Sequence, residues 1–358
     1  MLWFGYLKMN ESKLFLEKKI GVFCFFLAVL CILTCSGCGK TDENVKAEQN
    51  GSSVSDTGFF LDTAVTITLY DWSEEETIQK AFAEIQRLEQ LLSVELEDSE
   101  AAAISAGAGK QPVAVSEETL EVVKTAQAYA EKSGGKFDIT IGPLISLWNI
   151  HDGTGYVPKA EEREAAKALV GYEDLTISGN RVFLRRDGMA LNLGAIAKGY
   201  VSDRVKDLLK REGVEHAVIN LGGNVAVIGG KPDGTPFKIG VQDPFGETGE
   251  IIGMIELEDV SLISSGNYER YFEQDGVRYH HILDPDSGAP AEAGLSAVTV
   301  LTEKGIDGDA LSTSVFLLGA EKGLELVKSI EGAEALLVDA DGTITMTDGL
   351  KEKWTAYE

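Results

Sequence analysis

The clearest pattern near the start of the chain is an alternation of apolar and polar side chains. The segment Phe59 to Tyr70 is rich in β-branched residues and alternates from Thr63 onward, which predicts a strand. Apolar residues then recur every three or four positions from Ile78 to Leu92, which predicts an amphipathic helix. Ser73 and Glu76 in front of it have the spacing of a capping box, so we expect the helix to begin there.

The same patterns predict helices and strands in mixed order along the rest of the chain. Helices are expected from Ser116 to the Gly134-Gly135 pair, from Lys198 to Arg211, and after Asp309. Short strands separated by glycines begin at Ala217, and a hairpin turn is expected at Asp341-Gly342. There is no regular β-α-β alternation and no repeat period. The expected fold is therefore α+β, a single domain with a mixed, largely antiparallel sheet and packed helices.

The first 38 residues have the layout of a secretory signal. Lys13, Lys18 and Lys19 precede an apolar run from Ile20 to Leu33, and Ser36-Gly37-Cys38 resembles the site at which a bacterial lipoprotein is cleaved and lipidated. Residues 1–38 are thus predicted to be a lipoprotein signal peptide ending at a lipidated Cys38. An uncleaved membrane anchor is the alternative.

Residues 39–56 are polar and charged, which predicts a flexible linker, and residues 57–358 are predicted to be the folded domain. The domain is expected on the extracytoplasmic face of the cell membrane, held there by the lipid. All four cysteines lie at or before Cys38, so cleavage would leave no other cysteine for a disulfide or for thiolate chemistry.

Charge excludes some partners. The 58 acidic and 32 basic residues give a formal net charge of −26, which repels nucleic acid and anionic headgroups. Such a protein holds an anionic ligand only with the help of a local cation. Any phosphate site is therefore expected to need a metal ion.

The segment L-N-L-G-A-I-A-K-G-Y (191–200) suits a phosphate group. It predicts a short apolar strand, Met189 to Leu193, then a turn of small residues and a helix whose first turn carries Lys198. Helix N-termini offer unpaired N–H groups and positive potential, to which this lysine adds a full charge. A strand-to-helix turn with a solvated lysine is the alternative.

Asp309 and Thr313 are four residues apart in a predicted helix, so they lie on one face and can point at a common atom. Two hard oxygens suit Mg²⁺. The alternative is that Asp309 caps the helix and Thr313 packs against its own turn.

His281 is a candidate general base, because histidine titrates near neutral pH. It could equally be a hydrogen-bonded imidazole at a strand end, with Asp284 starting the turn that follows. His151 and His216 have no partner pattern and are interpreted as structural.

Two glycine-flanked turns, Phe137-Asp138 and the segment 220–224, could line a nucleotide pocket or serve only as turns. The sequence contains no H-E-x-x-H, G-x-S-x-G or G-x-x-x-x-G-K-[ST] pattern. Zinc hydrolase, serine hydrolase and P-loop chemistry are therefore not expected.

Together and in this order, seven segments resemble the ApbE family of FAD:protein FMN transferases, and the resemblance covers nearly all of residues 57–358. The segments are F-D-I-T-I-G-P-L-I-S-L-W, L-N-L-G-A-I-A-K-G-Y, I-N-L-G-G-N, I-G-V-Q-D-P, S-S-G-N-Y-E-R-Y-F, H-H-I-L-D-P-D-S-G and D-A-L-S-T-S-V-F.

The resemblance implies that FAD binds with Mg²⁺ at its pyrophosphate and that its FMN half is transferred to a threonine hydroxyl of a partner protein, releasing AMP. It implies that the metal is held by the backbone carbonyl of Ala195 and the side chains of Asp309 and Thr313, and that His281 assists the transfer. The positions matched to FAD contacts are Leu61, Phe137, Asp138, Ile139, Asn192, Lys198 and Leu283.

The acceptors implied by the resemblance are flavin-carrying subunits of Rnf-type or sodium-pumping quinone reductase complexes, or FMN-binding domains. Two other functions use the same residues. One is a Mg²⁺-dependent FAD pyrophosphatase that gives FMN and AMP, and the other is a non-catalytic FAD-binding lipoprotein.

Three positions depart from the family pattern. The usual M-G-T appears as Leu61-Asp62-Thr63, the aromatic residue expected two positions after Ser93 is Glu95, and the common aspartate before the Lys198 turn is Asn192. The first two bear on affinity for the flavin ring. None of them removes the expected metal site.

Overall fold

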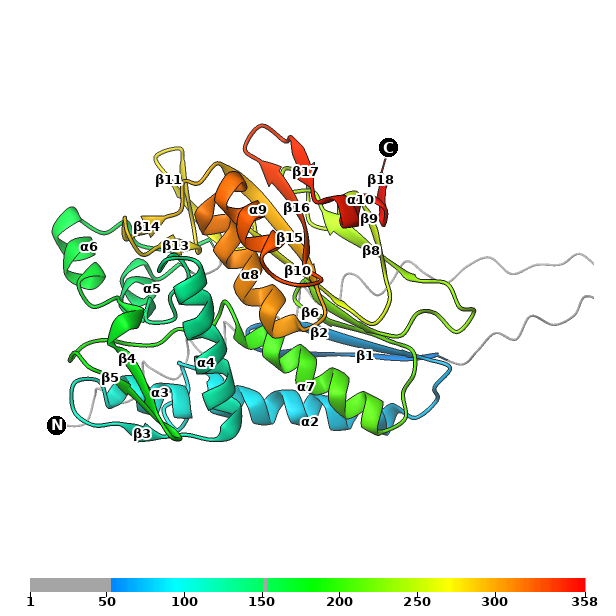
Figure 1. The fold of residues 1–358 in the computed structure, drawn as a ribbon, viewed down its shortest axis with the longest axis horizontal. Helices are drawn as coiled ribbons and strands as arrows, with labels where there is room; N and C mark the ends of the chain where they lie inside the picture. Colours follow the sequence, from blue (N-terminus) through cyan, green and yellow to red (C-terminus); the bar gives the residue numbers. More distant parts are fainter. Residues whose placement is uncertain (1–52, 151–152, 358) are drawn as a thin grey trace, which may run out of the picture. The chain divides into compact units, whose positions relative to one another are not determined.

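The computed structural model describes residues 53–150 and 153–357 (Figure 1). The predicted signal peptide with Cys38, most of the predicted linker, and His151 lie outside these ranges. Within them, no helix is both long enough and apolar enough to cross a membrane.

The chain enters the domain through a β-hairpin where one strand was expected. Strands β1 (Ser53–Phe60) and β2 (Thr63–Tyr70) pair antiparallel around a two-residue turn, Leu61-Asp62. Both turn residues have positive φ, 52° and 57°, as the tight hairpin turn that matches strand twist requires. Prediction of a single strand from Phe59 was therefore wrong, and the alternation from Thr63 onward was right. Residues 53–56 were assigned to the flexible linker, but they pair with β2 and belong to the sheet.

The hairpin forms one edge of an eight-stranded sheet with the order β1-β2-β6-β7-β10-β15-β16-β17. The further strands are β6 (Ala217–Leu221), β7 (Asn224–Ile228), β10 (Ser261–Gly266), β15 (Leu295–Thr302), β16 (Glu334–Asp339) and β17 (Ile344–Met346). Every neighbouring pair is antiparallel. The largely antiparallel sheet is confirmed, whereas a mixed sheet is not what forms. In the described part of the chain, parallel pairing is confined to an isolated bridge between Ile141 and Ala190.

Helices cover one face of this sheet, and a smaller sheet covers the other. The main helices are α2 (Glu75–Leu92), α4 (Glu117–Lys132), α7 (Ala197–Arg211) and α8 (Gly305–Leu318). Alternate strand residues such as Ile67 and Ile219 are buried among these helices. Residues facing the other way, such as Val225 and Leu336, pack against a three-stranded sheet. That sheet has the order β18-β9-β8, from β8 (Phe237–Gln242), β9 (Ile251–Leu257) and β18 (Trp354–Ala356).

Shorter elements complete the domain. They are α3 (Glu100–Ala106), β3 (Val113–Ala114), α5 (Gly142–Trp148), α6 (Ala160–Lys167), a 3₁₀ turn (Tyr172–Asp174), β4 (Leu175–Ser178), β5 (Arg181–Leu184), β11 (Tyr271–Gln274), β12 (Val277–His280), β13 (Leu283–Asp284), β14 (Ala289–Pro290), α9 (Ala320–Lys328) and α10 (Asp348–Lys351).

Two helix starts were predicted from capping residues in the local sequence, and one of these predictions is correct. Ser116 caps α4 as predicted, because its hydroxyl accepts a hydrogen bond from the Thr119 N–H at 3.3 Å. The capping box predicted at Ser73 does not form. Helix α2 has Glu74 at its N-cap with no side-chain cap, so Ser73 lies one residue too early.

Two further boundaries near the predicted site differ from expectation. Helix α8 begins at Gly305, so Asp309 lies in its second turn and is not its cap. Residues 189–193 form no strand. Their one strand-like pairing in the described structure is the isolated bridge between Ala190 and Ile141. This segment runs through the interior with Met189, Leu191 and Leu193 buried, which explains an apolar pattern without strand pairing.

Candidate functional site

A cavity of about 1400 Å³ opens where several loops meet at one end of the sheet. It is lined by the β1–β2 turn, the segment before α5, the start of α7, the loop after β10, the segment after β12 and one face of α8. All eleven residues predicted to bind FAD, hold metal or assist transfer line it. They are Leu61, Phe137, Asp138, Ile139, Asn192, Ala195, Lys198, His281, Leu283, Asp309 and Thr313.

The start of α7 leaves a carbonyl oxygen free. The Ala195 carbonyl lies before Ile196, the N-cap of α7, so it is outside the hydrogen bonds of the helix, and the N–H of Gly199 in the first turn has no acceptor within the helix. It instead donates to Asp309 Oδ2 at 2.9 Å. Among the residues that the structure describes, no other N–H donates to this carbonyl, which belongs to a cavity-lining residue. The Ala195 carbonyl is therefore a hard oxygen that is available to a cation.

The Asp309 carboxylate is buried and held by donors on both oxygens. Gly199 donates to Oδ2, and the side-chain amide of Asn224, at the start of β7, donates to Oδ1 at 2.9 Å. Asn224 is itself buried, and its Oδ1 has no partner in the described structure. Thr313 lies one turn further along α8, with its hydroxyl 3.4 Å from Ser265 Oγ. Asp309 and Thr313 thus share the cavity face of one helix, and the capping alternative for Asp309 does not apply.

Helices α7 and α8 approach each other so closely that glycine is required at the contact. A Cβ atom added at Gly199 would lie 2.2 Å from the Gly305 carbonyl oxygen and 2.8 Å from Asp309 Cβ. A Cβ at Gly305 would lie 2.4 Å from Ser202 Oγ. This contact brings Ala195 and Lys198, near the start of α7, to the same place as Asp309.

The N-terminus of α8 is capped from α7. The Asp203 carboxylate accepts hydrogen bonds from the N–H groups of Gly305, at 2.6 Å, and Ile306, at 2.9 Å. Lys304, the local N-cap residue, makes no side-chain cap. Burial raises the pKa of Asp203 to about 6, against the opposing effect of these backbone donors. The cap joins the two helices one turn before Asp309.

His281 is oriented by the main chain of Arg270. Its Nδ1 lies 3.2 Å from the Arg270 carbonyl oxygen, which also accepts a hydrogen bond from the His281 backbone N–H. A carbonyl only accepts, so Nδ1 carries the proton and Nε2 keeps its lone pair. Burial lowers the pKa of His281 to about 3, with a smaller contribution from neighbouring His280. The imidazole is therefore neutral, with its lone pair on Nε2.

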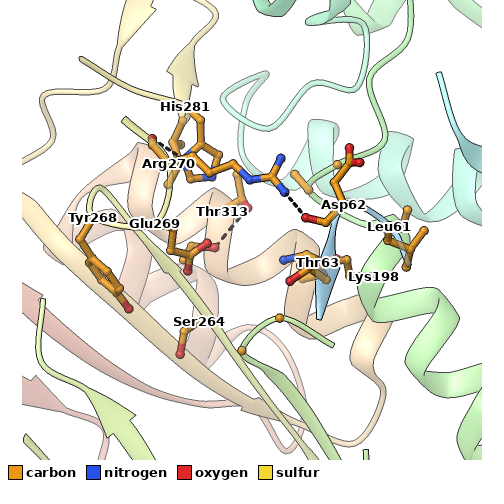
Figure 2. Close-up of a pocket in the computed structure, with 18 of the residues that line it drawn as sticks. Leu61, Asp62, Thr63, Lys198, Ser264, Tyr268, Glu269, Arg270, His281 and Thr313 are labelled. Carbon is orange, nitrogen blue, oxygen red and sulfur yellow. Dashed lines mark hydrogen bonds between the residues drawn. The ribbon is translucent and has the colours of Figure 1, made fainter. Parts of the chain in front are cut away.

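Charged side chains cross the cavity near His281. Figure 2 shows Arg270 reaching from the loop after β10 to the β1–β2 turn, where its guanidinium donates to the Asp62 carbonyl at 3.1 Å. Lys198 and Glu269 lie beneath this bridge in the same view. Withdrawal from bulk solvent raises the pKa of Glu269, and the cations of Lys198 and Arg270 oppose that effect. The cavity thus carries its own positive charges within a strongly acidic protein.

Segments 136–139 and 281–285 also line the cavity. Phe137 is buried, and Asp138 is fixed by the backbone N–H and the hydroxyl of Thr140, each at 2.7 Å. Burial raises the pKa of Asp138. Lys136 forms an ion pair with Asp284 at 2.8 Å, which ties the two segments together. The predicted Phe137-Asp138 turn therefore does line the cavity.

Two other histidines, His280 and His216, each have a ring nitrogen in contact with a backbone carbonyl. His280 is buried, with Nε2 3.1 Å from the Ala291 carbonyl, and burial lowers its pKa. His216 Nδ1 lies 2.8 Å from the Gly230 carbonyl, away from the cavity. The structural interpretation of His216 agrees with this contact.

Four residues important for the geometry were not singled out from sequence as site residues: Gly199, Asp203, Asn224 and Arg270. Each acts through a partner distant in sequence, so local spacing carries no signal for its role. Three of them do lie inside quoted segments: Gly199 in L-N-L-G-A-I-A-K-G-Y, Asn224 in I-N-L-G-G-N and Arg270 in S-S-G-N-Y-E-R-Y-F.

Known proteins share much of this sequence. A sequence profile described as the ApbE family matches residues 61–337. A Klebsiella pneumoniae protein named FAD:protein FMN transferase is 38% identical over 289 residues, covering 80% of this chain and 89% of the relative. A Treponema pallidum protein of the same name is 31% identical over 355 residues, covering 94% of each chain.

Solved structures show the same fold. The flavin transferase ApbE from Vibrio cholerae superposes with a TM-score of 0.77 at 29% identity, covering 84% of this chain and 99% of the other. The profile match spans more than half of the sequence, and the two relatives named above exceed 30% identity over most of it. The chain therefore belongs to the ApbE family.

Proposed function

We propose that this protein is a Mg²⁺-dependent FAD:protein FMN transferase, which moves the FMN half of FAD to a threonine hydroxyl of a partner protein and releases AMP. The observation that carries the proposal is the arrangement around Asp309. Its carboxylate is fixed by Gly199 and Asn224 beside the Thr313 hydroxyl, and the Ala195 carbonyl just before α7 accepts no backbone hydrogen bond from the described residues. The names of the relatives support the same reaction.

The oxygens present fit Mg²⁺. A carboxylate, a hydroxyl and a backbone carbonyl are hard donors, and few protein ligands are needed because phosphate and water complete the shell. Asp309, Thr313 and Ala195 would hold the ion. When bound, it would neutralise charge on the pyrophosphate oxygens.

In the proposed reaction, the threonine oxygen forms a bond to the phosphorus of the FMN half, and the bond from that phosphorus to the bridging oxygen breaks. AMP leaves with that oxygen. His281 Nε2 is the proton acceptor for the threonine hydroxyl, because Nδ1 is committed to the Arg270 carbonyl. Lys198 adds a positive charge near the phosphates. The transfer thus needs no covalent enzyme intermediate.

The location of the protein is also a proposal. The lysine-flanked apolar run and Ser36-Gly37-Cys38 support a lipid anchor that holds the domain on the extracytoplasmic face of the cell membrane. Acceptors would then be membrane or extracytoplasmic flavoproteins, such as an Rnf-type or sodium-pumping quinone reductase subunit or an FMN-binding domain.

Intact mass of an acceptor tests the reaction. Full-length protein in detergent is incubated with FAD, Mg²⁺ and an FMN-binding domain that carries an acceptor threonine. A mass gain equal to one FMN, absent when the threonine is replaced by valine or when Asp309→Ala is used, is expected. Free FMN and AMP with an unmodified acceptor would identify a pyrophosphatase, and unchanged bound FAD would identify a carrier.

A further inference from the structure

Strand β8 presents an open edge to the cavity. In the sheet order β18-β9-β8 it is the terminal strand, and within the described residues it pairs only with β9. Four of its six residues line the cavity, namely Lys238, Ile239, Gly240 and Gln242. An unpaired edge is a template for another strand.

The hydrogen-bond pattern between β8 and β9 shows which backbone groups of β8 point away from β9. Glu256 of β9 donates its N–H to the Lys353 carbonyl, on the β18 side. Residues alternate along an antiparallel strand, so Ile255 bonds instead to its β8 partner Ile239. Lys238 and Gly240 flank Ile239 and therefore turn their N–H and C=O groups away from β9. This is the two-residue spacing with which one antiparallel strand binds the next.

The space beside this edge suits a polypeptide. Gly240 is exposed and has no side chain, so an incoming backbone can approach it closely. The Lys238 ammonium lies 3.3 Å from Glu256, on the neighbouring strand. In the adjacent loop Phe245 lines the cavity with 59% of its surface exposed, which offers an apolar contact to a bound segment.

The size of the cavity also points to a second reactant. Pockets for one small ligand or cofactor usually occupy about 300–1,000 Å³. This cavity measures about 1400 Å³ and contains both His281 and the β8 edge. It therefore has room beside the nucleotide for part of another protein.

We propose that the Lys238–Gly240 edge of β8 binds the acceptor protein, by adding an extended segment of it as a further strand and so bringing its threonine into the cavity with His281. The inference rests on the proposed transferase function, which requires a protein segment to reach this cavity. Main-chain hydrogen bonds give affinity in this mode of recognition, and side-chain pockets give specificity.

Two matched pairs of variants test the edge: Gly240→Pro against Gly240→Ala, and Lys238→Pro against Lys238→Ala. Proline removes an outward N–H and is tolerated on edge strands, whereas alanine keeps it. Both replacements at Gly240 place a Cβ atom 2.9 Å from Ile251 Cγ2, so the effect of this contact is the same in both variants. We expect each proline variant to have a kcat/KM for the FMN-binding domain about tenfold below its alanine counterpart. FAD affinity, measured by flavin fluorescence, should be equal within each pair.

Amide hydrogen exchange gives a second readout that needs no turnover. The full-length protein is mixed with FAD and the FMN-binding domain whose threonine is replaced by valine. Exchange at the amides of Lys238 and Gly240 should slow by at least tenfold, and exchange on β17, at the far edge of the large sheet, should not change. This readout separates the inference from the proposed function, since failure of wild-type transfer contradicts the function alone.

Three results would overturn the inference. Equal kcat/KM values within both pairs would show that the outward N–H groups bind nothing in the acceptor. FAD affinity lowered by proline would assign the edge to the nucleotide. Dissociation of a wild-type dimer by the proline variants, seen by light scattering, would assign it to a second copy of the chain.

Discussion

At the scale of single residues, chemistry in the cavity depends on side chains whose orientation is set by the main chain. Asp309 receives hydrogen bonds from Gly199 and Asn224, and His281 is turned by the Arg270 carbonyl. Partners that orient ligands in this way usually contribute strongly to metal affinity or activity. Removing these partners should therefore lower metal affinity more than it lowers the stability of the fold.

Asn224→Ala tests this at the metal site. The variant loses the donor to Asp309 Oδ1, so the carboxylate gains freedom, and we expect Mn²⁺ affinity to fall about 10- to 100-fold. Titration followed by electron paramagnetic resonance measures it. Asn180→Ala, in the exposed β4–β5 turn, is the control and should bind Mn²⁺ as the wild type does. Wild-type affinity in Asn224→Ala would contradict the orienting role.

The pH dependence of transfer tests His281. A histidine at its ordinary pKa would lose its basic form as the pH falls through about 6.5. Because the pKa of His281 is lowered to about 3, the basic form is present above that value and is lost only as the pH falls through it. We expect His281 to cause no break in kcat/KM between pH 8 and 5 at saturating Mg²⁺. A break near 6.5 that disappears in His281→Ala would refute this, and the variant itself should be about 10²- to 10⁴-fold slower.

At the scale of elements, two helices form the proposed metal site together. Helix α7 provides Lys198, and Ala195 lies two residues before its start. Helix α8 provides Asp309 and Thr313, and Asp203 of α7 caps α8. Neither helix carries a complete site. The glycines at positions 199 and 305 set how closely the two helices approach.

Gly199→Ala should push the helices apart. Its Cβ would meet the Gly305 carbonyl, a backbone atom that cannot swing away, so overpacking should cost about 1–3 kcal/mol of stability. The displacement should also weaken Mn²⁺ binding. Chemical denaturation and metal titration measure the two effects. Asp207→Ala, on the exposed side of α7, should change neither, and a stable Gly199→Ala with normal affinity would show that the close approach is dispensable.

Asp203 makes stability depend on pH. Its folded-state pKa of about 6 lies above the ordinary value of 3.8, so the folded protein binds this proton more tightly than the unfolded chain. The resulting stabilisation is fully present below about 3.8 and is lost as the pH rises through about 6. Relative to Asp203→Asn, the wild type should therefore gain unfolding free energy between pH 6 and 4. Parallel denaturation curves measure the difference, and the opposite slope would contradict the assignment.

At the scale of the whole molecule, metal binding and folding should be coupled. The site joins β7, α7 and α8, so a ligand that binds only the folded protein stabilises the whole domain. We expect Mg²⁺ at about 100 times its Kd to add about 2.7 kcal/mol to the free energy of unfolding. Chelation with EDTA should reverse the gain, and Asp309→Ala should abolish it. A gain that persists in this variant would place the stabilising ion elsewhere.

Local sequence determined much of the secondary structure and the residues predicted to bind FAD, hold the metal or assist transfer. Periodicity identified α2, α4 and α7, and the spacing of Asp309 and Thr313 identified a shared helix face, because these signals act within a few residues. The seven segments contain ten of the eleven predicted site residues, all except Leu61, and the structure brings all eleven to one cavity. The strand expected from Phe59 failed where two non-glycine residues adopt positive φ in the Leu61-Asp62 turn.

Only the tertiary structure decided what requires contacts between distant segments. The start of α8 depends on a cap from Asp203, about a hundred positions earlier in the chain, and Asp309 depends on Gly199 and Asn224. His281 carries its proton on Nδ1 because that atom faces the Arg270 carbonyl. The edge of β8 is open because β8 is the terminal strand of the sheet β18-β9-β8. Hydrogen bonds and close packing between remote segments leave no periodic trace in the sequence, because each is made once, in three dimensions, by residues that fit many other local patterns equally well.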